Sequence, residues 1–217
     1  MAAIVPTITT DNQAFFDESL SKFSQFSKRI QVDASDGSFA PTTLVPLSSM
    51  KFPDNIVVDL HVMSARPSEH LSEILALKPK LCILHAEVDD DLSAVYAQLK
   101  EAGIKTGLAM IKTTFPGKVA TLIQTVDHVM IFAGELGSQG GTIDMMQTEK
   151  IPLIRTIRPD VEIGWDGGAN LSNVRALAHA NINVINVGSA ITQAADAAAM
   201  YQSPTAQKLT ARPLLHR

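Results

Sequence analysis

Hydrophobic residues follow two alternating patterns along this chain. Short runs of consecutive apolar residues predict strands that are buried on both faces of a sheet. Stretches in which apolar side chains recur every three or four residues predict helices. Predicted strands cover residues 4–7, 56–63, 81–85, 105–111, 128–132, 161–165 and 183–187, and a further strand runs through Ile30 and Val32 to Asp33. The first predicted helix begins near residue 11. Further helices are predicted over residues 43–50, 69–77, 92–102, 118–125, 144–157 and 171–180, and an alanine-rich helix follows the last strand.

Strands and helices therefore alternate about eight times, a pattern that indicates a parallel α/β fold. A closed (β/α)8 barrel, the TIM barrel, and an open doubly wound sheet both show this pattern. The even spacing and the polar residues at many strand ends favour the barrel. No linker divides the chain, so we expect one domain over residues 1–217, with a loose end or a surface contact beyond about residue 203.

Composition narrows the class of protein. Of the 217 residues, 46% are hydrophobic and 18% are charged, as in a well-buried soluble protein. The net charge of −4 gives no basic patch for nucleic acid, so an anionic substrate must be held by local features. The one cysteine, Cys82, cannot form an internal disulfide. Without a signal peptide or a membrane-length apolar run, the sequence predicts a cytoplasmic protein with no membrane partner.

Polar side chains gather where the predicted strands end. Gln31 and Asp33 point to the same side of one strand, because residues two apart share a face. His61, His85 and Asp166 lie at the ends of three other strands. In a barrel these ends meet at one mouth. Two carboxylates and a histidine there could bind a divalent metal, or the acids could work as paired acid and base on opposite faces of a substrate.

Structural alternatives exist for each of these residues. Asp33 could cap the next helix, and a lone histidine such as His61 fits a hydrogen-bonded core residue. His85 could be a residue that does not bind the ligand itself but orients a side chain that does. Asp33 and Asp166 are harder to explain in this way, since a buried carboxylate needs partners. The two acids therefore favour a functional role.

Glycines follow the last three strands. The segments are Gly137-Ser138-Gln139-Gly140, Gly167-Gly168 and Gly188-Ser189. Loops after the last strands of a barrel commonly bind phosphate through backbone N–H groups, and glycine lets the backbone approach closely. Any one pair could be an ordinary turn, but three consecutive loops predict a phosphorylated substrate whose reacting carbons lie above Asp33 and Asp166.

These motifs resemble the ribulose-phosphate 3-epimerase family. The matching stretches, in chain order, are Pro6-Thr7-Ile8; Val32-Asp33 with Asp36-Gly37-Ser38-Phe39-Ala40-Pro41; Asp59-Leu60-His61-Val62-Met63 with Pro67; His85-Ala86-Glu87; the glycine loop at 137–140; Asp166-Gly167-Gly168 with Asn170; and Gly188-Ser189-Ala190-Ile191. The match covers roughly residues 4–192 and implies a ribulose-phosphate-binding type of TIM barrel.

The resemblance implies a reaction and its residues. Asp33 and Asp166 would be the acid and base that interconvert D-ribulose 5-phosphate and D-xylulose 5-phosphate at C3. A divalent metal (Zn, Fe, Mn, Co or Mg) held by Asp33, His61 and Asp166, with Gln31 at a fourth ligand position, would stabilise the enediolate. The substrate and its phosphate would contact Thr10, His61, Met63 and the glycine segments, including Gly140, Gly168, Gly188 and Ser189. A sugar phosphate is the expected partner, and a homo-oligomer is the expected assembly.

The chain departs from the family pattern at several positions. Gln31 stands where the family usually has a histidine ligand, which predicts weaker metal binding, a preference for Mg²⁺ or Mn²⁺, or no metal. Ser35 and Phe132 stand where methionines are usual, and Ile111-Lys112 replaces an Asn-Pro pair.

Three functions therefore stay open: this epimerase, an epimerase of another ketose phosphate such as allulose 6-phosphate, and a barrel that binds sugar phosphates without turnover. Barrel decarboxylases and hexulose-phosphate synthases carry a D-x-K-x-x-D motif. These families are disfavoured, because Asp33 is followed by Ala34 and Ser35 and no lysine lies beside it.

Overall fold

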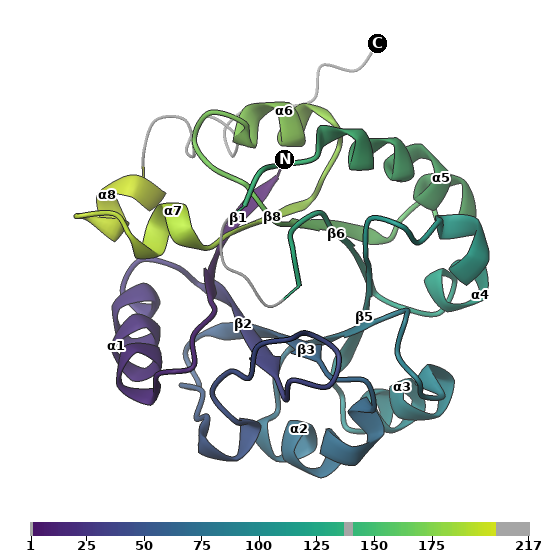
Figure 1. Ribbon diagram of the computed structural model, residues 1–217, viewed down its shortest axis with the longest axis horizontal. Coiled ribbons are helices and arrows are strands. Elements are labelled where there is room, and N and C mark those ends of the chain that lie inside the picture. The colour runs from purple at the N-terminus through teal and green to yellow at the C-terminus, as the bar shows by residue number, and fades with distance from the viewer. Residues whose placement is uncertain (1, 137–140, 203–217) are drawn as a thin grey trace.

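The strands close into a barrel that is surrounded by helices (Figure 1). The computed structural model describes residues 2–136 and 141–202. The strands are β1 (Ala3–Ile8), β2 (Arg29–Ser35), β3 (Val57–Met63), β4 (Leu81–His85), β5 (Lys105–Met110), β6 (His128–Phe132), β7 (Glu162–Asp166) and β8 (Val184–Val187). Each strand is parallel to the next, and β8 pairs with β1. This last pairing confirms the predicted closed barrel and excludes the open sheet.

Helices cover the outer face of the barrel (Figure 1). They are α1 (Gln13–Ser24), α2 (Leu71–Leu77), α3 (Leu92–Glu101), α4 (Ala120–Ile123), α5 (Lys150–Ile157), α6 (Val174–His179), α7 (Ser189–Thr192) and α8 (Ala197–Tyr201). α8 lies against the end of α1, where the rings of Tyr201 and Phe26 are 5.1 Å apart. Among the described residues, no helix has both the length and the apolar character needed to cross a bilayer.

The helix predicted over residues 43–50 was wrong. The connection from β2 to β3 contains only a 3₁₀ turn, Leu47–Ser49. Pro46 precedes this turn, Met50 is already extended, and Pro53 follows closely. Because a proline disfavours helical backbone at the residue before it and donates no hydrogen bond, two prolines leave room for one turn only.

The barrel interior has an apolar half and a polar half. Successive residues of β4 point to opposite faces, so Cys82 and Leu84 join the core under the helices while Leu81 and Ile83 join an inner cluster. The inner cluster consists of Leu81, Ile83, Ala109, Met130 and Phe132, from β4, β5 and β6. The interior positions of β2, β3 and β7 carry polar side chains instead, and these form both an ionic network and the functional site.

The ionic network closes the end of the barrel at which the strands begin. Arg29 donates to Asp59 at 2.7 Å and, through both terminal nitrogens, to Glu162 at 2.9 and 2.7 Å. His128 Nδ1 lies 2.8 Å from the same Glu162 carboxylate. Burial alone would raise the pKa of Glu162, but hydrogen bonds from Arg29 and His128 lower it well below its usual range. Packing is tight here, since a Cβ at Gly164 would lie 2.4 Å from His128 Nε2.

We expect Arg29→Met to destabilise the protein, because it leaves two carboxylates together without their cation. Breaking a buried ion pair costs about 3–5 kcal/mol. Since the Arg29 side chain is 26% exposed, the expected loss is about 2–3 kcal/mol in urea unfolding. The control is Arg66→Met, whose side chain is 67% exposed in a surface pair; it should cost at most about 0.5 kcal/mol. Equal losses in the two variants would contradict the role of the network.

The lowered pKa of Glu162 makes its stabilising effect depend on pH. The effect is complete above the unfolded-state pKa of about 4.3 and is lost as the pH falls through the folded-state pKa. Glu162→Gln should therefore lower the free energy of unfolding more at about pH 7 than at about pH 3. Asp160→Asn, at an exposed position, is the control and should show no such difference. A loss from Glu162→Gln that is the same at both pH values would count against this assignment.

Candidate functional site

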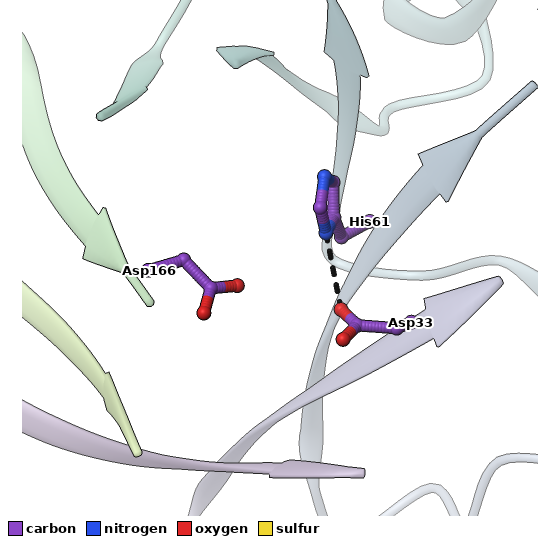
Figure 2. A group of neighbouring side chains, drawn as sticks. All are labelled: Asp33, His61 and Asp166. Atoms are coloured by element: carbon purple, nitrogen blue, oxygen red, sulfur yellow. Dashed lines mark hydrogen bonds and ion pairs between the residues drawn. The ribbon is translucent and has the colours of Figure 1, made fainter. Parts of the chain in front are cut away.

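Three side chains from different strands point toward one another near the ends of their strands (Figure 2). Asp33 comes from β2, His61 from β3 and Asp166 from β7. One potential ligand atom of each lies within 4.8 Å of the others. Asp33 and His61 are neighbours because β2 and β3 pair in that register, and Asp166 faces them from the other side of the barrel (Figure 2). Barrel closure therefore brings together residues that are far apart in the sequence.

Gln31 joins the two carboxylates. Its Nε2 donates to Asp33 Oδ1 at 2.9 Å and to Asp166 Oδ2 at 2.5 Å. Thr9 fixes the other oxygen of Asp33 by donating to it at 2.6 Å. The carbonyl oxygen of Gln31 is buried without a hydrogen-bond partner among the described residues. Gln31 thus holds the acids together and keeps one acceptor free.

The surroundings of Asp166 favour its protonated form more than water does. Loss of hydration and the nearby charge of Asp33 raise the pKa of Asp166 to about 6, although His61 and the hydrogen bond from Gln31 act in the opposite direction.

His61 and His85 form a buried pair behind the acids. His61 Nδ1 lies 3.1 Å from Asp33 Oδ1, and its Nε2 lies 2.9 Å from His85 Nε2. Burial would lower the pKa of His61, but the hydrogen bond and charge of Asp33, with the charge of Asp166, raise it. Burial and the neighbouring His61 lower the pKa of His85 to about 4. The surroundings therefore favour the protonated form of His61 and the neutral form of His85.

Glu87 stands behind His85. Its carboxylate approaches His85 Nδ1 at 3.4 Å and accepts a hydrogen bond from the backbone of Ile111. The ring of Phe39 lies 4.6 Å from the His85 ring, which fixes its orientation from another side. His85 is therefore placed to orient His61, the alternative that the sequence left open for it.

A pocket opens above the acids, and residues of opposite character line it. Asp33 and Asp166 form part of its floor, and Met63 and Phe132 form an apolar wall. The predicted phosphate-binding residues Gly167, Gly168, Gly188 and Ser189 all line the same pocket. The other predicted loop residues, Gly137, Ser138, Gln139 and Gly140, lie outside the described residues, although their neighbours Glu135 and Gly141 line the pocket.

Glycine is required at one of these loops. Gly167 has a φ of +110°, and a Cβ there would lie 2.1 Å from the backbone nitrogen of Gly134. Any side chain would therefore separate the loops after β6 and β7. This contact joins two loops that border the proposed phosphate position.

Two predicted substrate contacts differ from the structure. Thr10 does not line the pocket: its hydroxyl accepts from the Asn12 N–H at 3.1 Å, before α1 begins. Thr7 and Thr9 line the pocket instead, because alternate residues leaving β1 face inward. His61 is completely buried below the pocket, so it reaches the acids and not the pocket wall.

The sequence analysis also missed Asn186, a pocket-lining residue of β8. A usable signal was present, since Asn186 lies two residues before Gly188 and therefore shares its face of the strand. Asn186 stands between Ile185 and Val187, and an asparagine among buried apolar residues is a polar group that needs a partner.

The donor set fits a divalent metal ion. Two carboxylates and one imidazole are a mixed oxygen and nitrogen set that suits several divalent metals. The unpartnered carbonyl oxygen of Gln31 offers a fourth donor of the type that Mg²⁺ and Mn²⁺ accept.

Comparison with solved structures shows the fold. The chain aligns with 3-hexulose-6-phosphate synthase from Salmonella typhimurium at a TM-score of 0.68 and 14% identity, covering 96% of this chain and 98% of that one. It aligns with phosphoribosyl anthranilate isomerase from Thermococcus kodakaraensis at a TM-score of 0.62 and 13% identity, covering 98% of this chain and 100% of that one. At these identities the likeness extends to the barrel and no further.

Comparison with curated sequences shows the family. The ribulose-phosphate 3-epimerase of Schizosaccharomyces pombe is 23% identical over 200 residues, which cover 89% of this chain and 88% of the relative. That of Helicobacter pylori is 26% identical over 174 residues, which cover 77% and 80%. The model of the ribulose-phosphate 3 epimerase family matches residues 3–192. Because this match spans most of the sequence, the chain belongs to the ribulose-phosphate 3-epimerase family.

Proposed function

We propose that this protein is an epimerase that interconverts D-ribulose 5-phosphate and D-xylulose 5-phosphate. One observation carries the proposal: Asp33 and Asp166 reach one pocket from β2 and β7, and glycine loops border that same pocket. Inversion of a carbon centre needs proton transfer on both of its faces, so two acids are required. The family relatives bear the name of this reaction.

The residues divide the work between proton transfer and binding. One carboxyl group, ionised, removes the proton at C3, and the other, protonated, delivers a proton to the opposite face. Gln31 and Thr9 fix the orientation of the acids through the hydrogen bonds described above. Backbone N–H groups near Gly168 and Gly188 bind the phosphate, and Met63 and Phe132 exclude water above the reacting carbons.

A divalent cation would be held by Asp33, His61 and Asp166, with the carbonyl oxygen of Gln31 as a fourth donor. When bound, it would supply positive charge next to the oxygens that become negative during proton removal. His85 and Glu87 would then keep the His61 ring in position.

Two other functions use parts of the same geometry. A ketohexose phosphate such as allulose 6-phosphate needs the same pair of acids, so it belongs among the test substrates. Binding without turnover is suggested by Gln31, whose amide already occupies both carboxylates. The experiment below separates these functions.

Asp33→Asn and Asp166→Asn should each abolish epimerisation of D-ribulose 5-phosphate, with losses in kcat of roughly 10²–10⁴-fold or more, because each removes one proton carrier. A coupled assay with added Mg²⁺, Mn²⁺, Fe²⁺ or Zn²⁺ measures the rates. The matched control is Asp160→Asn, an exposed carboxylate before β7, at the opposite end of the strand from Asp166. Turnover of allulose 6-phosphate alone would support the second function, and saturable binding without any turnover would support the third.

Gln31→His should bind divalent metal more tightly than the wild type, because imidazole is a stronger donor than an amide oxygen. We expect an increase of about tenfold or more in affinity for Co²⁺ or Zn²⁺, measured by titration calorimetry after chelator treatment. Gln31→Met, which offers no oxygen or nitrogen donor, is the control and should bind metal no more tightly than the wild type. Unchanged affinity in Gln31→His would mean that residue 31 does not face the metal.

A further inference from the structure

One pocket residue has no role in the reaction as described. Asn186 is 2% exposed and lines the pocket, yet its side-chain Oδ1 has no hydrogen-bond partner among the described residues. Leaving such a buried polar group unpaired costs about 1–3 kcal/mol. A structural asparagine looks different in this chain: Asn183 accepts from Arg155 at 2.7 Å and from the Ile163 N–H at 2.8 Å. Asn186 has the properties of a group whose partner is a ligand.

Strand register places Asn186 between the acids and the phosphate loop. In β7 and β8, Gly164 pairs with Val184 and Trp165 with Ile185. The next step along these parallel strands sets Asn186 beside Asp166. Two residues farther along the same face, Gly188 reaches the proposed phosphate position.

We propose that Asn186 hydrogen-bonds the C4 hydroxyl of the substrate and so selects sugar phosphates that carry it. This inference rests on the proposed function, which places C3 at the acids and the phosphate, on C5, at the glycine loops. C4 lies between these two groups, as Asn186 lies between Asp166 and Gly188. A carboxamide can both donate and accept, and so can a hydroxyl, so a half-turn of the amide matches either orientation.

A neighbouring residue agrees with a ligand in this position. Thr7 is 3% exposed, lines the same pocket, and its hydroxyl also has no partner among the described residues. Thr7 and Asn186 do not satisfy one another. A polyhydroxylated chain would offer partners to both, whereas an apolar ligand would leave both unpaired at an added cost.

The test compares a ligand that has the hydroxyl with one that lacks it. The probes are D-ribitol 5-phosphate, which has no carbonyl and cannot react, and its 4-deoxy analogue. Asn186→Leu has nearly the same shape but cannot hydrogen-bond. We expect this variant to bind D-ribitol 5-phosphate roughly 10–100-fold more weakly than the wild type, measured by titration calorimetry. The 4-deoxy analogue should bind wild type and variant equally. Asn55→Leu, at an exposed position before β3, is the control and should change neither affinity.

The Tm of the Asn186→Leu variant is a second measurement, and a purely structural role of Asn186 predicts the opposite change in it. Replacing Asn186, whose buried oxygen is unpaired, with an apolar group of similar size should leave the Tm of the ligand-free protein unchanged or raise it. A lowered Tm, an equal loss of affinity for both probes, unchanged affinity, or no binding of D-ribitol 5-phosphate to the wild type would each overturn the inference.

The outcomes also separate this inference from the proposed function. Epimerisation of D-ribulose 5-phosphate by Asn186→Leu with an unchanged KM would overturn the inference alone. Hydroxyl-dependent binding by a wild type that turns over no pentulose phosphate would overturn the proposed function alone.

Discussion

Asp33 and Asp166 carry like charges, and the site depends on holding them close together. Repulsion between two carboxylates in a pocket is strong, because little water is present to screen it. The structure offsets this repulsion with hydrogen bonds from Gln31 to both acids and from Thr9 and His61 to Asp33. The acids stay together because hydrogen-bond donors surround them. Burial, followed by the remaining repulsion from Asp33, raises the pKa of Asp166 to about 6.

Barrel closure makes this arrangement possible. Asp33 and Asp166 come from β2 and β7, which are not neighbours in the ring of strands. Only the pairing of β8 with β1 brings the end of the chain back to its beginning. The apolar cluster around Ile83 and Met130 fills one part of the interior, while the polar side chains form the site above and the Arg29 network below.

The sequence predicted the parts of the site that depend on strand ends. Gln31 and Asp33 share a face in any strand, and a closed barrel brings Asp166 to them, so the central group could be anticipated. Thr10 was assigned from its resemblance to a family serine, but the structure turns Thr9, one residue earlier, toward the pocket, and a shift of one residue reverses the face. The contact from Arg29 to Glu162 spans 133 positions of the chain and follows from no local pattern. Asn186 could have been found by applying the period of two to β8.

Gln31 changes the balance between pairing the acids and binding a cation. Its amide nitrogen now faces both carboxylates, and its carbonyl oxygen faces no partner. To donate that oxygen to a cation, the amide must turn by half a rotation and break two charge-assisted hydrogen bonds, each worth about 1.5–3 kcal/mol. The interactions of a bound cation must therefore offset the free energy of these two lost hydrogen bonds. The acids consequently keep a donor from Gln31 whenever no cation is present, so their alignment does not depend on the metal, whereas tight metal binding requires a stronger ligand at this one position.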